Sequence, residues 1–141
     1  MPSPDLIEQR QKELVAREWN VSAIEERFSR LAASGITPKR LDREEILRDK
    51  EMILDRVQRQ AEDYCYLMRN CAKSSATALL EEFGLGNLDI IRALGPFPGI
   101  AMSGGICGPV TGGLIALGLF FSNPDITKHD ATRAYLHARL F

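Results

Sequence analysis

The sequence predicts an all-α protein, a helical bundle with a central glycine-rich apolar helix. Apolar residues recur at three- and four-residue steps along most of the chain, helix-stop signals separate these runs, and no convincing alternating strand occurs. Of the 141 residues, 45% are apolar and 26% are charged. These values are ordinary for a folded protein and exclude a disordered or collagen-like chain. The length favours one domain with a real core.

Two helices are expected at the start of the chain. Ser3 is a candidate N-cap, followed by a proline in the first turn, for a helix that we expect to end near Trp19. Ser22 and Glu25 have the spacing of a capping box and predict the start of a second helix. Gly35 is a typical residue at which such a helix ends.

The strongest periodic signal follows Asp42, which forms a second capping-box pattern with Glu45. Apolar residues then keep helical steps, at Ile46, Ile53, Leu54, Val57, Ala61, Tyr64, Cys65 and Met68. This pattern predicts one long amphipathic helix. Because a helix with a wide apolar stripe needs partners, we expect the helices of residues 5–68 to assemble the chain into a homo-oligomer. Packing of the same stripe against the second half of the chain is the alternative.

Cap residues also predict two helices in the middle of the chain. Asn70 is a candidate N-cap for a helix of residues 71–83, which a glycine then ends. Asn87 or Asp89 is a candidate N-cap for a short helix behind it. The sequence Gly-Pro-Phe-Pro-Gly at residues 95–99 then breaks regular structure.

The last two predicted helices are apolar and alanine-rich. Pro109 suits the first turn of an apolar helix, and a stripe on it consists of Leu114, Leu117 and Phe121. We expect this helix to be buried at the centre of the bundle. Asn123 with the proline behind it, or Thr127 with Asp130, opens a final helix. One side of that helix carries Ala131, Ala134, Tyr135 and Ala138.

Residues 100–121 are uncharged over 22 positions, which is long enough to span a bilayer. Six of these residues are glycine, and the apolar residues are dense only in the second half. Neither end carries the tryptophan, tyrosine or basic cluster that is typical of a membrane span. We therefore expect a buried core helix behind a glycine-rich loop and no membrane partner.

Charge divides the chain into two parts. Residues 1–63 hold 12 of the 18 basic and 14 of the 19 acidic side chains. We accordingly expect residues 1–41 to form a charged N-terminal helical extension and residues 42–141 to form a cysteine-containing helical domain. The net charge of −1, without a basic excess, excludes a general nucleic-acid binder. A charged start without an apolar leader, and an odd number of cysteines, favour a reducing compartment, so we expect the protein in the cytoplasm.

Two cysteines lie where predicted helices begin. Cys71 follows a predicted cap, and Cys107 precedes the apolar helix, so both thiols lie where free backbone N–H groups and the helix dipole favour a thiolate. The glycines at Gly104, Gly105 and Gly108 allow backbone to approach a partner sulfur, an anion or a metal. We therefore expect the two cysteines to face each other as redox-active thiols. A tight helix crossing lined by small residues is the alternative.

The sequence gives weaker support for a ligand role of Cys65. It falls on the apolar face of the long predicted helix, which favours a packing role over a ligand role. A break near Arg69 would bring it close to Cys71. Three cysteines do not complete a tetrahedral metal site, so a fourth ligand would come from a histidine, a small molecule or another chain.

The segments AEDYCYLMRNCAKSSATALLEEFG and GGICGPVTGGLIALGLFF resemble the bacterial and archaeal family that is named for its C-GC-x-x-G-C-C pattern. That family consists of redox-active proteins related to the cluster-binding part of split-Soret cytochromes. Cys71 and Cys107 match its helix-opening cysteines, and the resemblance covers residues 57–121. It implies redox chemistry or an iron–sulfur cluster with Cys65, Cys71 and Cys107 as candidate metal ligands.

The chain departs from that family in two ways. Members usually carry a further cysteine behind the last helix, which is missing here, so we expect a shortened form. No CxxCH sequence occurs, and haem attachment is not implied. We expect a small redox or electron-transfer protein that uses its thiols as a dithiol/disulfide or as iron–sulfur ligands, with a redox partner protein. A non-catalytic helical interaction or assembly protein is the alternative.

Overall fold

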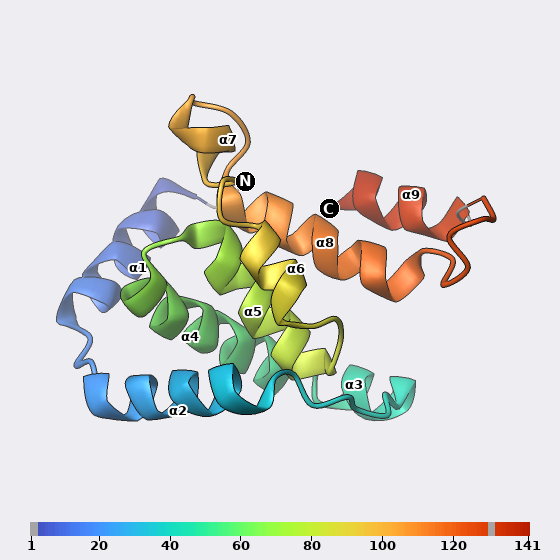
Figure 1. The fold of residues 1–141 in the computed structure, drawn as a ribbon. Coiled ribbons are helices and arrows are strands. Elements are labelled where there is room, and N and C mark those ends of the chain that lie inside the picture. Colours follow the sequence, from blue (N-terminus) through green and yellow to red (C-terminus); the bar gives the residue numbers. More distant parts are fainter. Residues whose placement is uncertain (1–2, 130–131) are drawn as a thin grey trace.

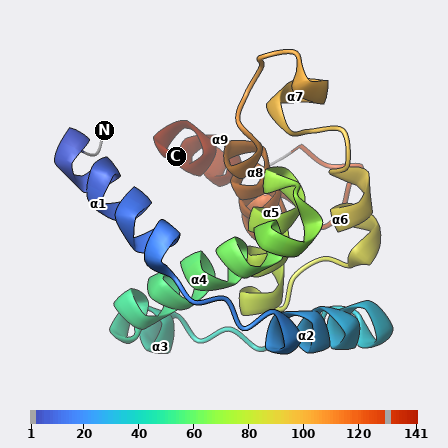
Figure 2. The ribbon, with the colours of Figure 1, turned by 90° about the vertical axis from the view of Figure 1, so that its left-hand side faces the viewer.

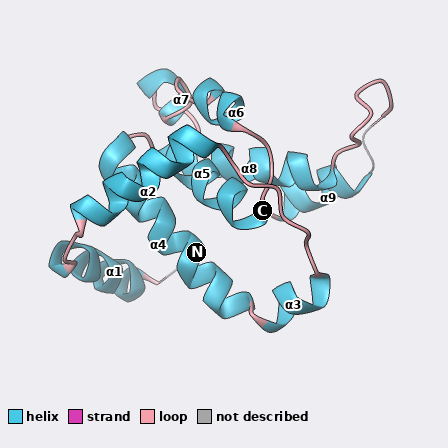
Figure 3. Cartoon of the chain, turned by 60° about the horizontal axis from the view of Figure 1, so that its bottom comes forward, coloured by secondary structure: helices cyan, strands magenta, loops and turns pink. Residues whose placement is uncertain are grey.

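The computed structural model describes residues 3–129 and 132–141 of the chain. Over these residues it contains nine helices and no strand, which confirms the predicted all-α class (Figure 3). In chain order (Figure 1) the helices are α1 (Pro4–Ala16), α2 (Val21–Ser34), α3 (Arg43–Arg48), α4 (Lys50–Met68), α5 (Cys71–Phe83), α6 (Leu88–Ala93), α7 (Gly99–Met102), α8 (Gly108–Phe121) and α9 (Thr132–Leu140).

Side-chain caps start most of these helices, as the sequence predicts. The side chains of Ser3, Asp42 and Asn87 each accept a hydrogen bond from a backbone N–H in the first turn of the helix that follows. The prediction for α2 was wrong by two residues. The Oδ1 of Asn20 accepts from the N–H of Ala23 at 3.1 Å, so the helix has already begun before Ser22.

The long helix predicted after Asp42 is interrupted. Asp49 separates α3 from α4, with φ −97° and ψ 15° in place of helical values. Its N–H still bonds the carbonyl of Glu45, and its own carbonyl accepts the N–H of Ile53. The backbone hydrogen bonds therefore continue on both sides of Asp49, although the helix axis changes direction there. Of these two helices, only α4 packs an apolar face against the core.

The core lies on both sides of α5. Between α2, α4 and α5, one apolar cluster is built on Leu31, Tyr64 and Ala78. Between α5, α6 and α8, a second cluster is built on Ala72, Ala76 and Leu94. Since α5 contributes to both clusters, it is the most deeply buried helix of the described chain. Figures 1 and 2 show it surrounded by α4, α6 and α8.

The expected burial of α8 needs a correction. This helix does lie between α5 and α9 (Figure 1). However, its buried residues are Gly108, Gly112 and Gly113, whereas the predicted stripe residue Leu114 is 38% exposed. A glycine face lets the neighbouring helices approach most closely, so α8 buries its glycines fully, while its larger residues are half-buried, as Ile115 is against the second cluster, or exposed, as Leu114 is.

The helix α1 lies apart from the core. It has no buried residue, and Figure 2 shows it extending away from the other helices. The chain behind it is held by Arg17, whose guanidinium pairs with Glu62 and Asp63 of α4 and lies over the ring of Trp19. This anchor ends α1 at Ala16, before the predicted Trp19. The assembly expected through residues 5–68 stays a prediction.

The C-terminal segment forms a helix, α9, beside α8. Phe141 packs on Gly113, and the ring of His137 contacts the ring of Phe121, so α9 runs antiparallel to α8. Of the residues expected to open or line this helix, Asp130 and Ala131 lie outside the described residues. Among the helices that are described, none combines the length and apolar character that crossing a membrane requires.

Candidate functional site

A left-handed residue allows Cys71 to open a new helix. The helix α4 ends at Met68, and its C-cap residue Arg69, with φ 48° and ψ 36°, redirects the chain into α5. Asn70 then caps α5, since its Oδ1 accepts the N–H of Lys73 at 2.9 Å. Cys71 is therefore the first residue of α5, where backbone N–H groups lack partners within the helix, and its side chain is half-buried.

Cys107 lies at the start of α8 as its N-cap residue. Its backbone is extended, with φ −62° and ψ 141°, and its side chain makes no capping hydrogen bond. Pro109 occupies the first turn, as the sequence predicts. The thiol of Cys107 is exposed, in contrast to the half-buried thiol of Cys71.

Glycines place these two helix starts side by side. A Cβ atom on Gly108 would lie 2.3 Å from the Sγ of Cys71, and a Cβ atom on Gly112 would lie 2.6 Å from the Oγ of Ser75. Both contacts are one helical turn apart on each helix, so α5 and α8 run parallel. Consecutive Cα atoms are 3.8 Å apart, so the Cα of Cys107 lies within about 8 Å of the Cys71 sulfur. The thiols are free in this structure.

The other two predicted glycines do not border the thiols. A Cβ atom on Gly104 would meet nothing within 4 Å, and one on Gly105 would meet Ile100 of the same loop. That loop contains α7, which projects from the end of the bundle at which α8 begins (Figures 1 and 2). Three of its non-glycine residues, Ile100, Ala101 and Met102, have positive φ angles. The loop therefore turns on itself and leaves Cys107 accessible.

The predicted metal ligands are not gathered into one group. Cys65 lies in the last turn of α4, half-buried, and its carbonyl accepts the N–H of Arg69. Among the residues that the structure describes, no three histidine, cysteine, aspartate or glutamate side chains are placed to hold a metal ion. An iron–sulfur cluster commonly takes four cysteine ligands. The described residues therefore do not fit a cluster held within one chain.

The charge around the two helix starts is positive. Lys73 lies in the first turn of α5, and its Nζ would be 3.8 Å from a Cβ atom on Gly95. It forms no ion pair with any described residue. Both helices add the partial positive charge of their N-termini. This arrangement favours the approach of an anionic group to the two helix starts. The signal for this feature in the sequence is Lys73, two residues behind the predicted helix start at Cys71, and it is not among the predicted site residues.

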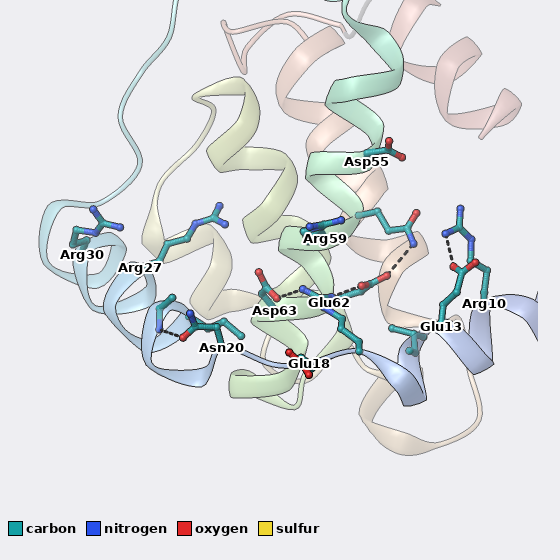
Figure 4. A pocket seen from close by; sticks show the side chains of 15 residues that line it. Arg10, Glu13, Glu18, Asn20, Arg27, Arg30, Asp55, Arg59, Glu62 and Asp63 are labelled. Carbon is teal, nitrogen blue, oxygen red and sulfur yellow. Dashed lines mark hydrogen bonds and ion pairs between the residues drawn. The ribbon is translucent and has the colours of Figure 1, made fainter.

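A groove lies elsewhere, between α1, α2 and α4, with a volume of about 850 Å³. Figure 4 shows arginines and carboxylates that line it, among them Glu62 and Asp63. Both of these carboxylates pair with Arg17. Five arginines and five acidic residues contribute, namely Arg10, Arg17, Arg27, Arg30, Arg59, Glu13, Glu18, Asp55, Glu62 and Asp63. Because these charges balance and none of the cysteines lines the groove, it carries no sign of thiol chemistry.

Comparison with known proteins gives a family match over a range that includes Cys71 and Cys107. A family model described as "Putative redox-active protein (C_GCAxxG_C_C)" matches residues 69–139. The sequence Asn-Cys-Ala-Lys-Ser-Ser at residues 70–75 has the cysteine and alanine of the run Gly-Cys-Ala-x-x-Gly in that name, with Asn70 and Ser75 in place of its two glycines. No curated protein and no solved structure matches the chain significantly.

Proposed function

Because the chain belongs to the C_GCAxxG_C_C family of putative redox-active proteins, we propose that it exchanges electrons through a Cys71–Cys107 dithiol/disulfide pair. The observation that carries this proposal is the contact of the Cys71 sulfur with Gly108, the residue that follows Cys107. A disulfide requires Cα atoms about 4.4–6.8 Å apart, and the close approach of Gly108 to the Cys71 sulfur supports a pairing of Cys71 with the preceding Cys107.

The different exposure of the two thiols assigns them different roles. The exposed Cys107 thiolate attacks one sulfur of a disulfide substrate, that S–S bond breaks, and the leaving thiolate takes up a proton. The Cys71 thiolate then attacks the Cys107 sulfur of the mixed disulfide and releases the second thiol. The protein loses two electrons and two protons, and the substrate disulfide gains both. Run in reverse, the same steps oxidise a dithiol.

The helix starts that carry the pair suit thiol–disulfide exchange. Both N-termini place partial positive charge beside Cys71 and Cys107, and a thiolate is the nucleophile in that exchange. The apolar residues Ile106 and Val110 flank Cys107 and are exposed, which suits a protein partner. The redox partner is therefore a protein disulfide or dithiol.

Thiol counting and peptide mapping test the proposal. The reduced protein should contain three reactive thiols, and protein equilibrated with oxidised glutathione should contain one. Mass spectrometry of an unreduced digest should find the peptides of Cys71 and Cys107 joined. Cys71→Ser and Cys107→Ser should each abolish this link, whereas the matched variant Cys65→Ser should retain it.

Two results would overturn the proposal. One is an oxidised wild-type protein in which Cys71 and Cys107 are not joined to each other. The other is iron and sulfide in stoichiometric amounts in protein purified without oxygen, because the thiols would then serve as cluster ligands.

A further inference from the structure

We infer that Asn70 is a positioning residue, which ties the start of α5 to the loop that carries Cys107. This inference rests on the proposed pairing of Cys71 with Cys107 and adds a residue that sets their geometry. The side chain of Asn70 makes two hydrogen bonds of different kinds. Its Oδ1 accepts the N–H of Lys73 at 2.9 Å, and its Nδ2 donates to the carbonyl of Gly95 at 3.0 Å.

The loop between α6 and α8 meets the first turn of α5 at both of its ends. It begins behind the buried Leu94, where Asn70 bonds Gly95, and it ends at Gly108, which lies against the Cys71 sulfur. Residues 100–107 between these ends are all exposed. The adjacent residues Asn70 and Cys71 therefore contact the two ends of the loop, and the loop positions Cys107 next to Cys71.

An asparagine suits this position because its amide offers both an acceptor and a donor. Serine, threonine and aspartate also cap helices well, but their caps use only an oxygen acceptor. The glycine that the family pattern has here would supply neither contact. The second hydrogen bond restricts the loop and so raises the effective concentration of Cys107 at Cys71. This restriction stabilises the disulfide relative to the dithiol.

The variant Asn70→Ser separates the two hydrogen bonds. Its hydroxyl still caps α5 and adds no charge, but it is too short to reach the Gly95 carbonyl. Asn87→Ser is the matched control, because Asn87 caps α6 by accepting from Asp89 and Ile90 while its N–H groups bond no described residue. Asn70→Thr repeats the test with a second capping hydroxyl, in case the serine variant fails to fold.

The first measurement is the equilibrium constant of the Cys71–Cys107 disulfide in glutathione buffers. We expect Asn70→Ser to lower it about fivefold, the value of one net hydrogen bond. For a two-electron couple this raises the reduction potential by about 20 mV. Asn87→Ser should leave it unchanged. Circular dichroism checks that the variants keep the wild-type helix content.

The second measurement does not depend on disulfide formation. Iodoacetamide modifies the thiols of the fully reduced protein, and mass spectrometry gives the rate at Cys71 relative to Cys65. Asn70→Ser should raise this ratio, because the freed loop uncovers Cys71. If wild-type protein never forms the disulfide, the proposed function fails, and the alkylation ratio still decides the role of Asn70. If Asn70→Ser behaves like Asn87→Ser in alkylation, the inference is wrong.

Discussion

The two sides of α5 are packed in different ways. Toward α2 and α4, the contact is made by large side chains and charges. Tyr64 is completely buried, and its hydroxyl donates a hydrogen bond to the Glu81 carboxylate at 2.5 Å. The same carboxylate forms an ion pair with Arg27 at 2.8 Å. Burial and the hydrogen bond with Glu81 raise the pKa of Tyr64. Beside this group, Arg56 forms two hydrogen bonds with the carboxylate of Glu82.

Toward α8, the contact is made by backbone and small side chains. Gly108 lies against Cys71, and Gly112 lies against Ser75 and Ala76, so a Cβ atom on either glycine would clash. The first side therefore buries a large ring and pairs its charges, whereas the glycine side fixes a distance. The distance that it fixes is the one between the two helix starts that carry the cysteines.

Removal of the buried Tyr64 ring, on the side of α5 that faces α2 and α4, should have the largest effect on stability. We expect Tyr64→Ala to lower the free energy of unfolding by about 4 kcal/mol, the cost of deleting a buried aromatic ring. Chemical denaturation measures this change. Tyr66→Ala is the control, because Tyr66 is exposed and stacks only on Trp19, and it should cost about 1 kcal/mol. Equal losses in the two variants would contradict the assignment of the core.

A methyl group added to a glycine of α8 that faces α5 should lower stability less than Tyr64→Ala does. It should also lower the yield of the disulfide between the two cysteines. Gly112→Ala places a Cβ atom 2.6 Å from the Oγ of Ser75 and 2.9 Å from the backbone nitrogen of Ala76. We expect a loss of about 2 kcal/mol from overpacking. Because the helices must separate, the yield of the Cys71–Cys107 disulfide should also fall.

Gly118→Ala is the matched control on the same helix. The nearest atom to its new methyl group would be the Oγ of Ser122, 4.0 Å away. Alanine favours a helix over glycine, so this variant should gain about 0.5–1 kcal/mol in denaturation and leave the disulfide yield unchanged. If Gly112→Ala is tolerated as well as Gly118→Ala, α5 and α8 are not in close contact.

Loss of the ion pair between Arg56 and Glu82, on the side of α5 that faces α4, should have the smallest effect on stability. This effect should depend on pH. The hydrogen bonds from Arg56 lower the pKa of the Glu82 carboxyl, while burial opposes this shift. A carboxyl whose pKa is lowered by folding stabilises the protein above its unfolded pKa, and this contribution disappears as the pH falls through the folded pKa. Because Arg56 is half-exposed, the contribution at pH 7 is up to about 1 kcal/mol.

Denaturation at several pH values measures this contribution. Arg56→Gln should be less stable than wild type at pH 7, and the difference should shrink as the pH falls below the ordinary glutamate pKa toward the lowered folded pKa of Glu82. Arg48→Gln, which removes an exposed pair with Asp49, should match wild type throughout. A constant difference between Arg56→Gln and wild type across this range would show that the pair acts through packing instead of charge.

Much of the secondary structure follows from local chemistry. Ser3, Asp42, Asn70 and Asn87 cap helices as the sequence predicts, because a cap needs only its own side chain and the next three residues. Two predictions fail for local reasons, because Asn20 caps α2 before Ser22 and Asp49 separates α3 from α4, and one fails because a distant residue competes. The first helix ends early since Arg17 turns to α4.

The sequence by itself determined that the chain is helical and that Cys71 and Cys107 both lie at helix starts, because caps, glycines and prolines act over one helical turn. Only the tertiary structure decided that these starts lie side by side, that α5 and not α8 is the most buried helix, and that Asn70 bonds Gly95. The physical reason is that helix pairing depends on how closely two surfaces approach. That approach depends on which residues of both helices face each other, and no single segment specifies it.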